Sequence, residues 1–284
     1  MNDLTNVNQQ DLQAMNELLG TQVTGGTGGA IVRVPELKIN SRSRDKDTKK
    51  AIPEGSYFLT NMEQKVYGEN VTFRPLATHI QYFHWEEIDG KRTLVNKSIA
   101  IPSPRDEARD IKGGIACGYP SWETLQEMDY ADAKVYKSMK HRVTRGLVSY
   151  DGVTADGEKV SIENQPCIMF HKNSTFGGFW NGYMKNLPKG SNIYEYETEM
   201  GADYNENGSV VWYTPFYTVD LSKKLDMTQQ VFDTMSVFAQ AIKKENQEID
   251  AKYFTAIKEG SLDSKAMNAL NIEDSLDDDF VDVA

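Results

Sequence analysis

Residues 70–76, NVTFRPL, and residues 78–88, THIQYFHWEEI, are two β-type segments that lead into Asp89-Gly90 and then into RTLVNKSIAIP at 92–102. An Asp-Gly pair between runs of β-branched and aromatic residues is a strong short-range hairpin signal. The sequence therefore predicts an antiparallel hairpin at this point, and it predicts a domain built mainly from such strands.

The same pattern recurs on both sides of this hairpin. Alternating segments occur as IVRVPELKIN at 31–40 and GSYFLTN at 55–61. Further pairs flank an Asp156-Gly157 turn (VTRGLVSYDGV, 143–153, and GEKVSIENQPCIMF, 157–170) and an Asn207-Gly208 turn (SNIYEYETEM, 191–200, and SVVWYTPFYTVDL, 209–221). Repeated short strands with turn signals indicate an antiparallel barrel or sandwich.

A long amphipathic helix is predicted over residues 226–259. Asp226 is a suitable N-cap, and Gln229 three positions later completes a capping box. Apolar residues then recur mostly at steps of three, four or seven, up to Gly260. Because Glu245 and Asn246 interrupt the apolar stripe, we expect the helix to dock on the β-domain and not to form a coiled coil.

The expected domain organisation has four parts. Residues 1–29 end in a Gly-rich run and form a flexible N-terminal arm. Residues 30–222 form the β-domain, residues 226–259 the amphipathic helix, and residues 260–284 a disordered acidic tail. The fold class predicted from these parts is α+β, mainly β, with an antiparallel barrel followed by a long C-terminal helix.

Charge is distributed unevenly along the 284 residues. The formal net charge is −11, but residues 273–284 carry six acidic residues and no basic one, so the remainder sums to −5. Residues 30–150 hold 20 Lys and Arg against 16 Asp and Glu, and all nine arginines lie between Arg33 and Arg145. This separation of basic residues from an acidic C-terminal segment is typical of proteins that bind nucleic acid and carry an acidic tail.

Composition also narrows the cellular compartment. The chain has no apolar run near the ~18 residues that a membrane span needs, and its N-terminus lacks the features of a secretory signal. Two cysteines, Cys117 and Cys167, cannot form a disulfide framework. We therefore expect a protein of the reducing cytoplasm without membrane contact.

No catalytic signature is recognisable. The four histidines do not have metal-ligand spacing, and the two cysteines are most simply read as buried. Glu195, Glu197 and Glu199 alternate in a segment expected to be a strand, so they share one face. Such a face is more often exposed to solvent than part of a metal site. The prediction is a protein that is not an enzyme and that uses no cofactor or metal.

Features typical of nucleic-acid binding occur together. KVYKSMKHRVTR at 134–145 has five basic residues and no acid, and residues 33–50 have seven basic residues against three acidic ones. Exposed aromatic rings interleaved with cations can stack on bases without sequence preference. The candidate nucleic-acid-binding residues are Arg33, Lys38, Arg42, Arg44, Tyr57, Tyr67, Phe73, Arg74, Phe83, Trp85, Lys134, Tyr136, Lys137, Lys140, Arg142 and Arg145.

Three stretches of the chain carry a resemblance to a known family. PEGSYFLTNMEQKVYGENVTFRPL (53–76), the aromatic segment after it, and DSLDDDF (274–280) resemble the single-stranded DNA-binding proteins of tailed phages. The resemblance implies an OB-like barrel whose acidic tail, through Asp277, Asp278, Asp279 and Phe280, competes with DNA and recruits replication proteins such as a polymerase, helicase or primase. Four residues follow Phe280 here, whereas the family's aromatic residue usually stands at or near the end.

The expected function is sequence-independent binding of single-stranded DNA in phage DNA replication, recombination and repair, in the host cytoplasm. The sequence is compatible with a homo-oligomer and does not decide the oligomeric state. One alternative is a phage virion or assembly protein, and a less favoured one is a metal-dependent nuclease that uses the ladder from Glu195 to Glu199.

Overall fold

The computed structural model describes residues 34–45, 48–258 and 260. Arg33 and the tail residues Asp277, Asp278, Asp279 and Phe280 lie outside the described residues, as do the proposed arm at 1–29 and nearly all of 260–284. No helix in the described ranges has the length and apolarity required to cross a membrane.

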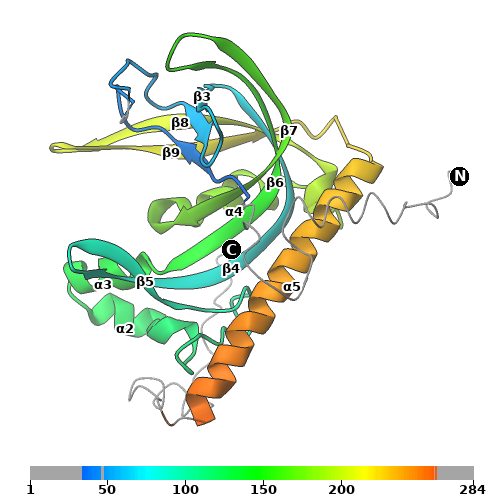
Figure 1. The fold of residues 1–284 in the computed structure, drawn as a ribbon. Coiled ribbons are helices and arrows are strands. Elements are labelled where there is room, and N and C mark those ends of the chain that lie inside the picture. The colour runs from blue at the N-terminus through cyan, green and yellow to red at the C-terminus, as the bar shows by residue number, and fades with distance from the viewer. Residues whose placement is uncertain (1–33, 46–47, 259, 261–284) are drawn as a thin grey trace, which may run out of the picture. The chain divides into compact units, whose positions relative to one another are not determined.

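The chain divides into two compact units. Among the described residues, the first unit takes those within 34–78 and 144–241, and the second takes those within 79–143 and 242–260. This division cuts across the single β-domain expected over 30–222. Strands β4 (Val71–Ile88) and β6 (Lys140–Thr154) and helix α5 (Gln229–Lys258) each contribute residues to both units (Figure 1).

The first unit is mainly β. Besides parts of β4 and β6, its strands are β1 (Leu37–Ile39), β2 (Tyr57–Leu59), β3 (Val66–Tyr67), β7 (Lys159–Lys172), β8 (Thr198–Asn207) and β9 (Val210–Val219). Its short helices are η2 (Asn173–Thr175), α4 (Gly178–Gly182), η3 (Met184–Asn186) and η4 (Ile193–Glu195). The first part of α5 also belongs to it.

The main sheet is antiparallel and open. Its strand order is β3-β6-β4-β8-β9, with β5 (Lys91–Lys97) paired to β4 and β7 paired to β6, while β1 and β2 form a separate pair. Single bridges join Glu36 to Ile168 and Tyr57 to Gly68 but do not extend into ladders. The prediction of a mainly β fold with a C-terminal helix is therefore confirmed, whereas the described strands form an unclosed sheet.

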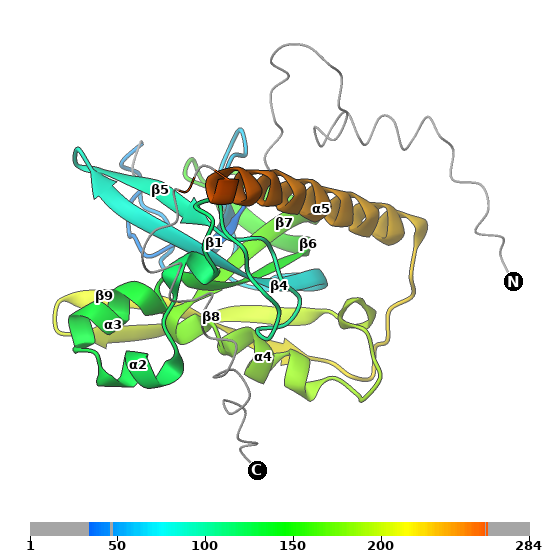
Figure 2. The same cartoon turned by 90° about the horizontal axis from the view of Figure 1, so that it is seen from below.

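The predicted hairpins are present, with one shift of register. Asp89 and Gly90, with φ of 52° and 70°, connect β4 to β5, as the left-handed positions of a tight hairpin turn require. In the β8–β9 hairpin Asn207 pairs with Val210. The turn therefore consists of Gly208 and Ser209, one residue later than expected, and Figure 2 shows the two strands side by side.

Segments 70–76 and 78–88, expected as separate strands, form the single strand β4. The β8 ladder ends at Phe73, so the strand passes through Pro75 where that ladder has already ended. Pro75 therefore removes no hydrogen-bond donor from the ladder with β8.

Aromatic side chains fill the core of the first unit. Tyr57, Phe73, Phe179 and Tyr183 are completely buried there. The Tyr183 hydroxyl lies 2.6 Å from the Ile193 carbonyl oxygen and 2.7 Å from that of Tyr196, so its one hydrogen has an acceptor inside the core. A second cluster, Leu76, Leu147, Val231 and Phe238, packs the first part of α5.

The second unit combines the ends of β4 and β6 with β5 and with helices η1 (Ala116–Gly118), α2 (Trp122–Glu127) and α3 (Tyr130–Lys137). Asp129 caps α3, because its carboxylate accepts from the N–H groups of Ala131 at 2.9 Å and Asp132 at 3.1 Å. The basic stretch 134–145 therefore begins in this helix and continues into β6.

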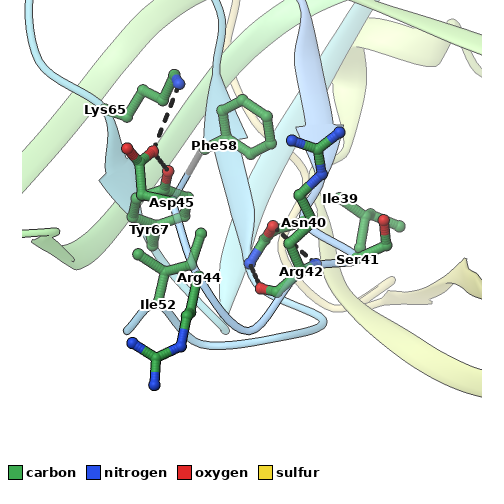
Figure 3. Close-up of a pocket in the computed structure, with 10 residues that line it drawn as sticks. All are labelled: Ile39, Asn40, Ser41, Arg42, Arg44, Asp45, Ile52, Phe58, Lys65 and Tyr67. Carbon is green, nitrogen blue, oxygen red and sulfur yellow. Dashed lines mark hydrogen bonds and ion pairs between the residues drawn. The ribbon is translucent and has the colours of Figure 1, made fainter. Parts of the chain in front are cut away.

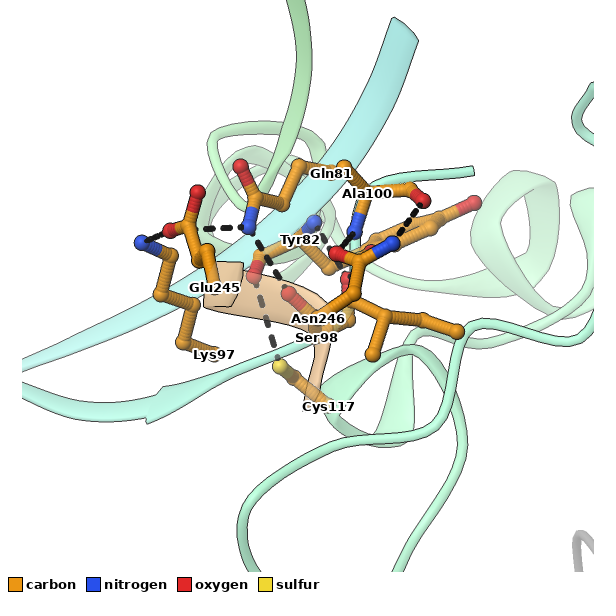
Figure 4. A network of polar contacts seen from close by, with 9 residues as sticks. Gln81, Tyr82, Lys97, Ser98, Ala100, Cys117, Glu245 and Asn246 are labelled. Atoms are coloured by element: carbon orange, nitrogen blue, oxygen red, sulfur yellow. Dashed lines mark hydrogen bonds and ion pairs between the residues drawn. The ribbon is translucent and has the colours of Figure 1, made fainter. Parts of the chain in front are cut away.

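Helix α5 begins at Gln229 and not at Asp226. The Thr228 hydroxyl accepts from the Val231 N–H at 3.3 Å, so Thr228 is the N-cap residue. Within the second unit, Glu245 and Asn246 make polar contacts to Lys97 and Ala100 (Figure 4). The two residues that interrupt the apolar stripe are thus the ones that fix this part of the helix.

The expected ladder of Glu195, Glu197 and Glu199 does not form. Glu195 belongs to η4, and β8 begins only at Thr198, so the three carboxylates do not alternate along one strand. Among the described residues no group of three or more His, Cys, Asp or Glu is arranged to hold a metal ion.

Candidate nucleic-acid interface

Five of the candidate residues, Tyr57, Tyr67, Phe73, Phe83 and Trp85, are predicted to stack on bases, and the first four of these rings lie in the protein core. Tyr57 and Phe73 are 0% exposed, Tyr67 3% and Phe83 8%. A ring buried to this extent packs against its neighbours and offers no face to a base, so the prediction for these four is corrected. Trp85 is 40% exposed and retains an accessible face.

The predicted cations in β6 are partly withdrawn from solvent. Arg145 is 7% exposed, and burial lowers the pKa of its guanidinium to about 10. Burial lowers the pKa of Lys140 and Arg142 too, with Arg142 adding to the effect on Lys140. Arg145, predicted as a DNA-binding cation, is therefore buried in the fold and does not offer its charge at the surface. Lys134 and Lys137 are exposed on α3, where Tyr136 is half-buried.

Two other candidates have structural partners. Arg74 donates from Nε to the Tyr194 carbonyl oxygen and from Nη2 to that of Asp226, both at 2.8 Å. The Lys38 ammonium forms an ion pair with Glu36 at 2.9 Å. Arg74 therefore ties β4 to the segment that leads into α5, and the Lys38 charge is already compensated.

Arg42 and Arg44 line a cavity of about 210 Å³ in the first unit, as does the half-buried ring of Phe58 (Figure 3). This volume is below the roughly 300–1,000 Å³ typical of cofactor sites. The cavity thus suits a group the size of a base or a phosphate.

Asn40 shapes the loop that bears the two arginines. Its side-chain amide donates to the carbonyl oxygens of Arg42 at 2.8 Å and Pro53 at 2.7 Å, and its Oδ1 accepts from the Arg42 N–H at 3.1 Å. The loop is thereby held to the segment before β2. A preorganised loop loses less conformational entropy when a ligand binds.

Asp45 anchors the other end of this loop. Its carboxylate accepts from the Tyr67 hydroxyl at 3.0 Å and from the Thr48 N–H at 2.9 Å, and it lies 3.6 Å from the Lys65 ammonium. The Tyr67 ring also contacts Phe58, with ring centroids 5.6 Å apart. Tyr67 therefore supports the cavity wall through its hydroxyl and its ring.

Cations around the cavity differ in how far they are compensated. Lys65 pairs with Asp45, and Lys50 forms an ion pair with Asp156. Arg42 and Arg44 are exposed, and no acidic group among the described residues pairs with either guanidinium. Arg44 donates to the Lys49 carbonyl oxygen at 3.3 Å, and Figure 3 shows the two arginines extending in opposite directions. Their charge is directed toward solvent.

The second unit has a separate exposed aromatic residue next to a cation. The Arg92 guanidinium lies 5.3 Å from the centroid of the Trp85 ring, on the hairpin of β4 and β5. A β-bulge between His84 and Trp85 shifts the register at the base of this hairpin. Trp85 is thus the one predicted stacking residue that the structure leaves exposed.

Sequence reasoning passed over Phe58 as a site residue. In the YFL strand at 57–59, Tyr57 and Leu59 face the core, and the period of two places Phe58 on the opposite face. That alternation was the available signal. Asn40 and Lys65 carry no comparable signal, because their roles depend on contacts between separate segments.

Comparison of this chain with known protein families, curated proteins and solved structures identifies no relative. No family model matches it, and no curated protein or solved structure matches it.

Proposed function

We propose that this protein binds single-stranded DNA without sequence preference, through the arginine-lined cavity of the first unit. The observation that carries this proposal is the position of Arg42 and Arg44, both exposed and without acidic partners among the described residues, around the same cavity as the Phe58 ring. Guanidinium groups bind phosphate oxygens, and an aromatic face stacks on any base.

Single strands suit this cavity better than a duplex does. Stacking on Phe58 requires a base that is not already paired and stacked inside a double helix. The two arginines extend in opposite directions and can contact successive phosphates of one strand (Figure 3). Exposed Trp85 with Arg92 in the second unit offers a further contact of the same type.

The wider role is proposed on the resemblance to tailed-phage single-stranded DNA-binding proteins. It is a part in phage DNA replication, recombination and repair, with the acidic tail recruiting replication proteins in the host cytoplasm. An OB-like arrangement is also part of this proposal, and the bridges from Glu36 to Ile168 and from Tyr57 to Gly68 support it.

Equilibrium binding to a labelled single strand and to its duplex, measured over a range of salt concentrations, tests the proposal. We expect preference for the single strand and a log–log salt slope of about −0.7 for each phosphate that the protein neutralises. Arg42→Glu and Arg44→Glu should weaken binding, whereas Lys189→Glu, the same charge change at an exposed site away from the cavity, should not.

Two outcomes would overturn the proposal. Equal affinity for single strand and duplex would remove the role of base stacking. Folded Arg42 and Arg44 variants that bind as tightly as Lys189→Glu would show that this cavity is not the DNA site.

A further inference from the structure

Strand β9 is the outer strand of the sheet in the first unit. It ends the strand order, and among the described residues it pairs with β8 only. Its ten residues, VVWYTPFYTV, contain no charge. Soluble proteins usually protect an edge strand with charged side chains or by making it short. Neither protection is present here, so the unpaired side of β9 is suited to pairing with another strand.

The hairpin register shows where the unpaired backbone groups lie. Asn207 and Val210 flank the two-residue turn and exchange hydrogen bonds. Hydrogen-bonded and non-hydrogen-bonded pairs alternate in an antiparallel ladder, so the N–H and C=O groups of Val211 and Tyr213 point away from β8. Pro215 has the same orientation and limits this edge, because it has no N–H to offer.

These unpaired groups are symmetric about Trp212. A second β9 that runs antiparallel and is centred on the same residue places Val211 opposite Tyr213 at both ends. Each of these pairs can exchange two backbone hydrogen bonds. Other registers bring Pro215 into the pairing or leave a donor without an acceptor.

Exposed apolar side chains lie at the same place. Val210 is 61% exposed, Trp212 37% and Phe216 44%, and the Phe216 ring lies so close above Gly201 that a Cβ there would be 2.2 Å from it. The neighbouring strand β8 carries Glu199, Asp203 and Glu206. Glu199 and Asp203 lie on the same face of the sheet as Trp212, and Glu206 lies on the opposite face. These acidic side chains disfavour a nucleic-acid strand, whereas an uncharged strand fits the uncharged edge.

We propose that β9 is a dimer interface and that its occupant is β9 of a second copy of this chain. Val211 then pairs with Tyr213 of the partner subunit, and the two Trp212 side chains become neighbours in a non-hydrogen-bonded pair. The acidic side chains on the two β8 strands stay separated by both β9 strands. Cross-strand aromatic pairs stabilise such a ladder.

Disulfide trapping tests the register. Cα atoms in a non-hydrogen-bonded pair lie about 4.5 Å apart, within the roughly 4.4–6.8 Å that a disulfide spans. Trp212→Cys should therefore give a covalent dimer on mild oxidation. Thr214→Cys, on the same face, is the matched control and should remain uncrosslinked, because it faces position 210 of the other copy. Cys117 and Cys167 are buried and do not compete.

Sedimentation equilibrium tests the association itself. We expect the mass of the wild-type protein to rise with concentration toward twice the 32.1 kDa of one chain. Val211→Pro removes one outward N–H and leaves the β8 ladder in place, so this variant should keep the mass of one chain at concentrations where the wild type is dimeric. Circular dichroism checks that it folds.

The proposal fails if the wild-type protein keeps the mass of one chain at every concentration. It also fails if the Trp212→Cys and Thr214→Cys variants crosslink to the same extent, or if folded Val211→Pro dimerises like the wild type. If Val211→Pro does not fold, the difference in crosslinking between Trp212→Cys and Thr214→Cys decides whether the proposed dimer forms.

Discussion

The side-chain amide of Asn246 on α5 pairs with the backbone of Ala100 as a neighbouring strand would. Its Oδ1 accepts from the Ala100 N–H at 2.7 Å, and its Nδ2 donates to the Ala100 carbonyl oxygen at 2.9 Å. Beside it, the Glu245 carboxylate accepts from the Lys97 ammonium and from the Gln81 amide (Figure 4). Since Ala100 is 6% exposed, water cannot readily replace Asn246.

Asn246→Ala should lower the free energy of unfolding. Two buried backbone groups of Ala100 lose their partner, at about 1–3 kcal/mol for each group. Urea denaturation followed by circular dichroism measures the loss. Gln247→Ala, at the next and exposed position of the same helix, is the control and should change stability little. Equal effects of the two substitutions would contradict this role of Asn246.

Asp110→Ala should destabilise the second unit. The buried Asp110 carboxylate accepts from the N–H groups of Lys112 at 3.0 Å, Gly114 at 3.1 Å and Cys117 at 2.9 Å, in a loop where Cys117 has a φ of 56°. Each such bond to a charged group contributes about 1.5–3 kcal/mol. Thermal unfolding should show a lower midpoint than that of Asp106→Ala, an exposed control in the same segment.

Stability should decrease as the pH rises above about 10, the ordinary pKa of tyrosine. Burial raises the pKa of Tyr150 to about 12, and it raises the pKa values of Tyr57, Tyr82 and Tyr183 as well. The unfolded chain then loses protons that the folded chain retains, so each such group lowers the unfolding free energy by up to about 1.4 kcal/mol per pH unit. The absorbance of tyrosinate should appear in the same pH range in which the circular dichroism of the folded protein is lost. Ionisation of the buried tyrosines while the protein remains folded would contradict the prediction.

Phe58→Ala should weaken binding of single-stranded DNA by about 1–3 kcal/mol, the contribution of one stacked base. Phe58→Trp should retain most of the affinity because it keeps a flat ring. Trp180→Ala removes an exposed ring elsewhere in the first unit and serves as the control. Fluorescence anisotropy with a short labelled single strand gives the affinities. A loss that Phe58→Trp does not restore would indicate a role in folding.

Deletion of residues 273–284 should tighten single-stranded DNA binding. The six acidic residues of this segment are tethered to the chain, so their effective concentration near a cationic site can reach the millimolar range. The gain should shrink as salt screens both competitors. A full-length variant in which these acidic residues are changed to their amides separates the effect of the tail's charge on DNA binding from the effect of its length. Phe280→Ala should leave DNA binding nearly unchanged. Weaker DNA binding after the deletion would contradict competition between the tail and DNA for the cationic site.

Local signals in the sequence determined the elements whose causes are themselves local. The left-handed Asp89-Gly90 turn, with the antiparallel hairpin that it forms, and the apolar period of α5 follow from a few adjacent residues, and the structure contains both. The start of α5 was misplaced by a few residues because Asp226 and Thr228 are both suitable caps.

Tertiary structure alone decided which faces of these elements meet the core. Alternation separates Tyr57 from Phe58, but only packing against other segments buries Tyr57 and leaves Phe58 at the cavity. Arg145 is buried although it closes a basic stretch that includes Lys140 and Arg142, and Glu245 pairs with Lys97, which lies far away along the chain. Burial and pairing between distant segments depend on the summed contacts of the whole fold, and no short stretch of sequence contains that sum.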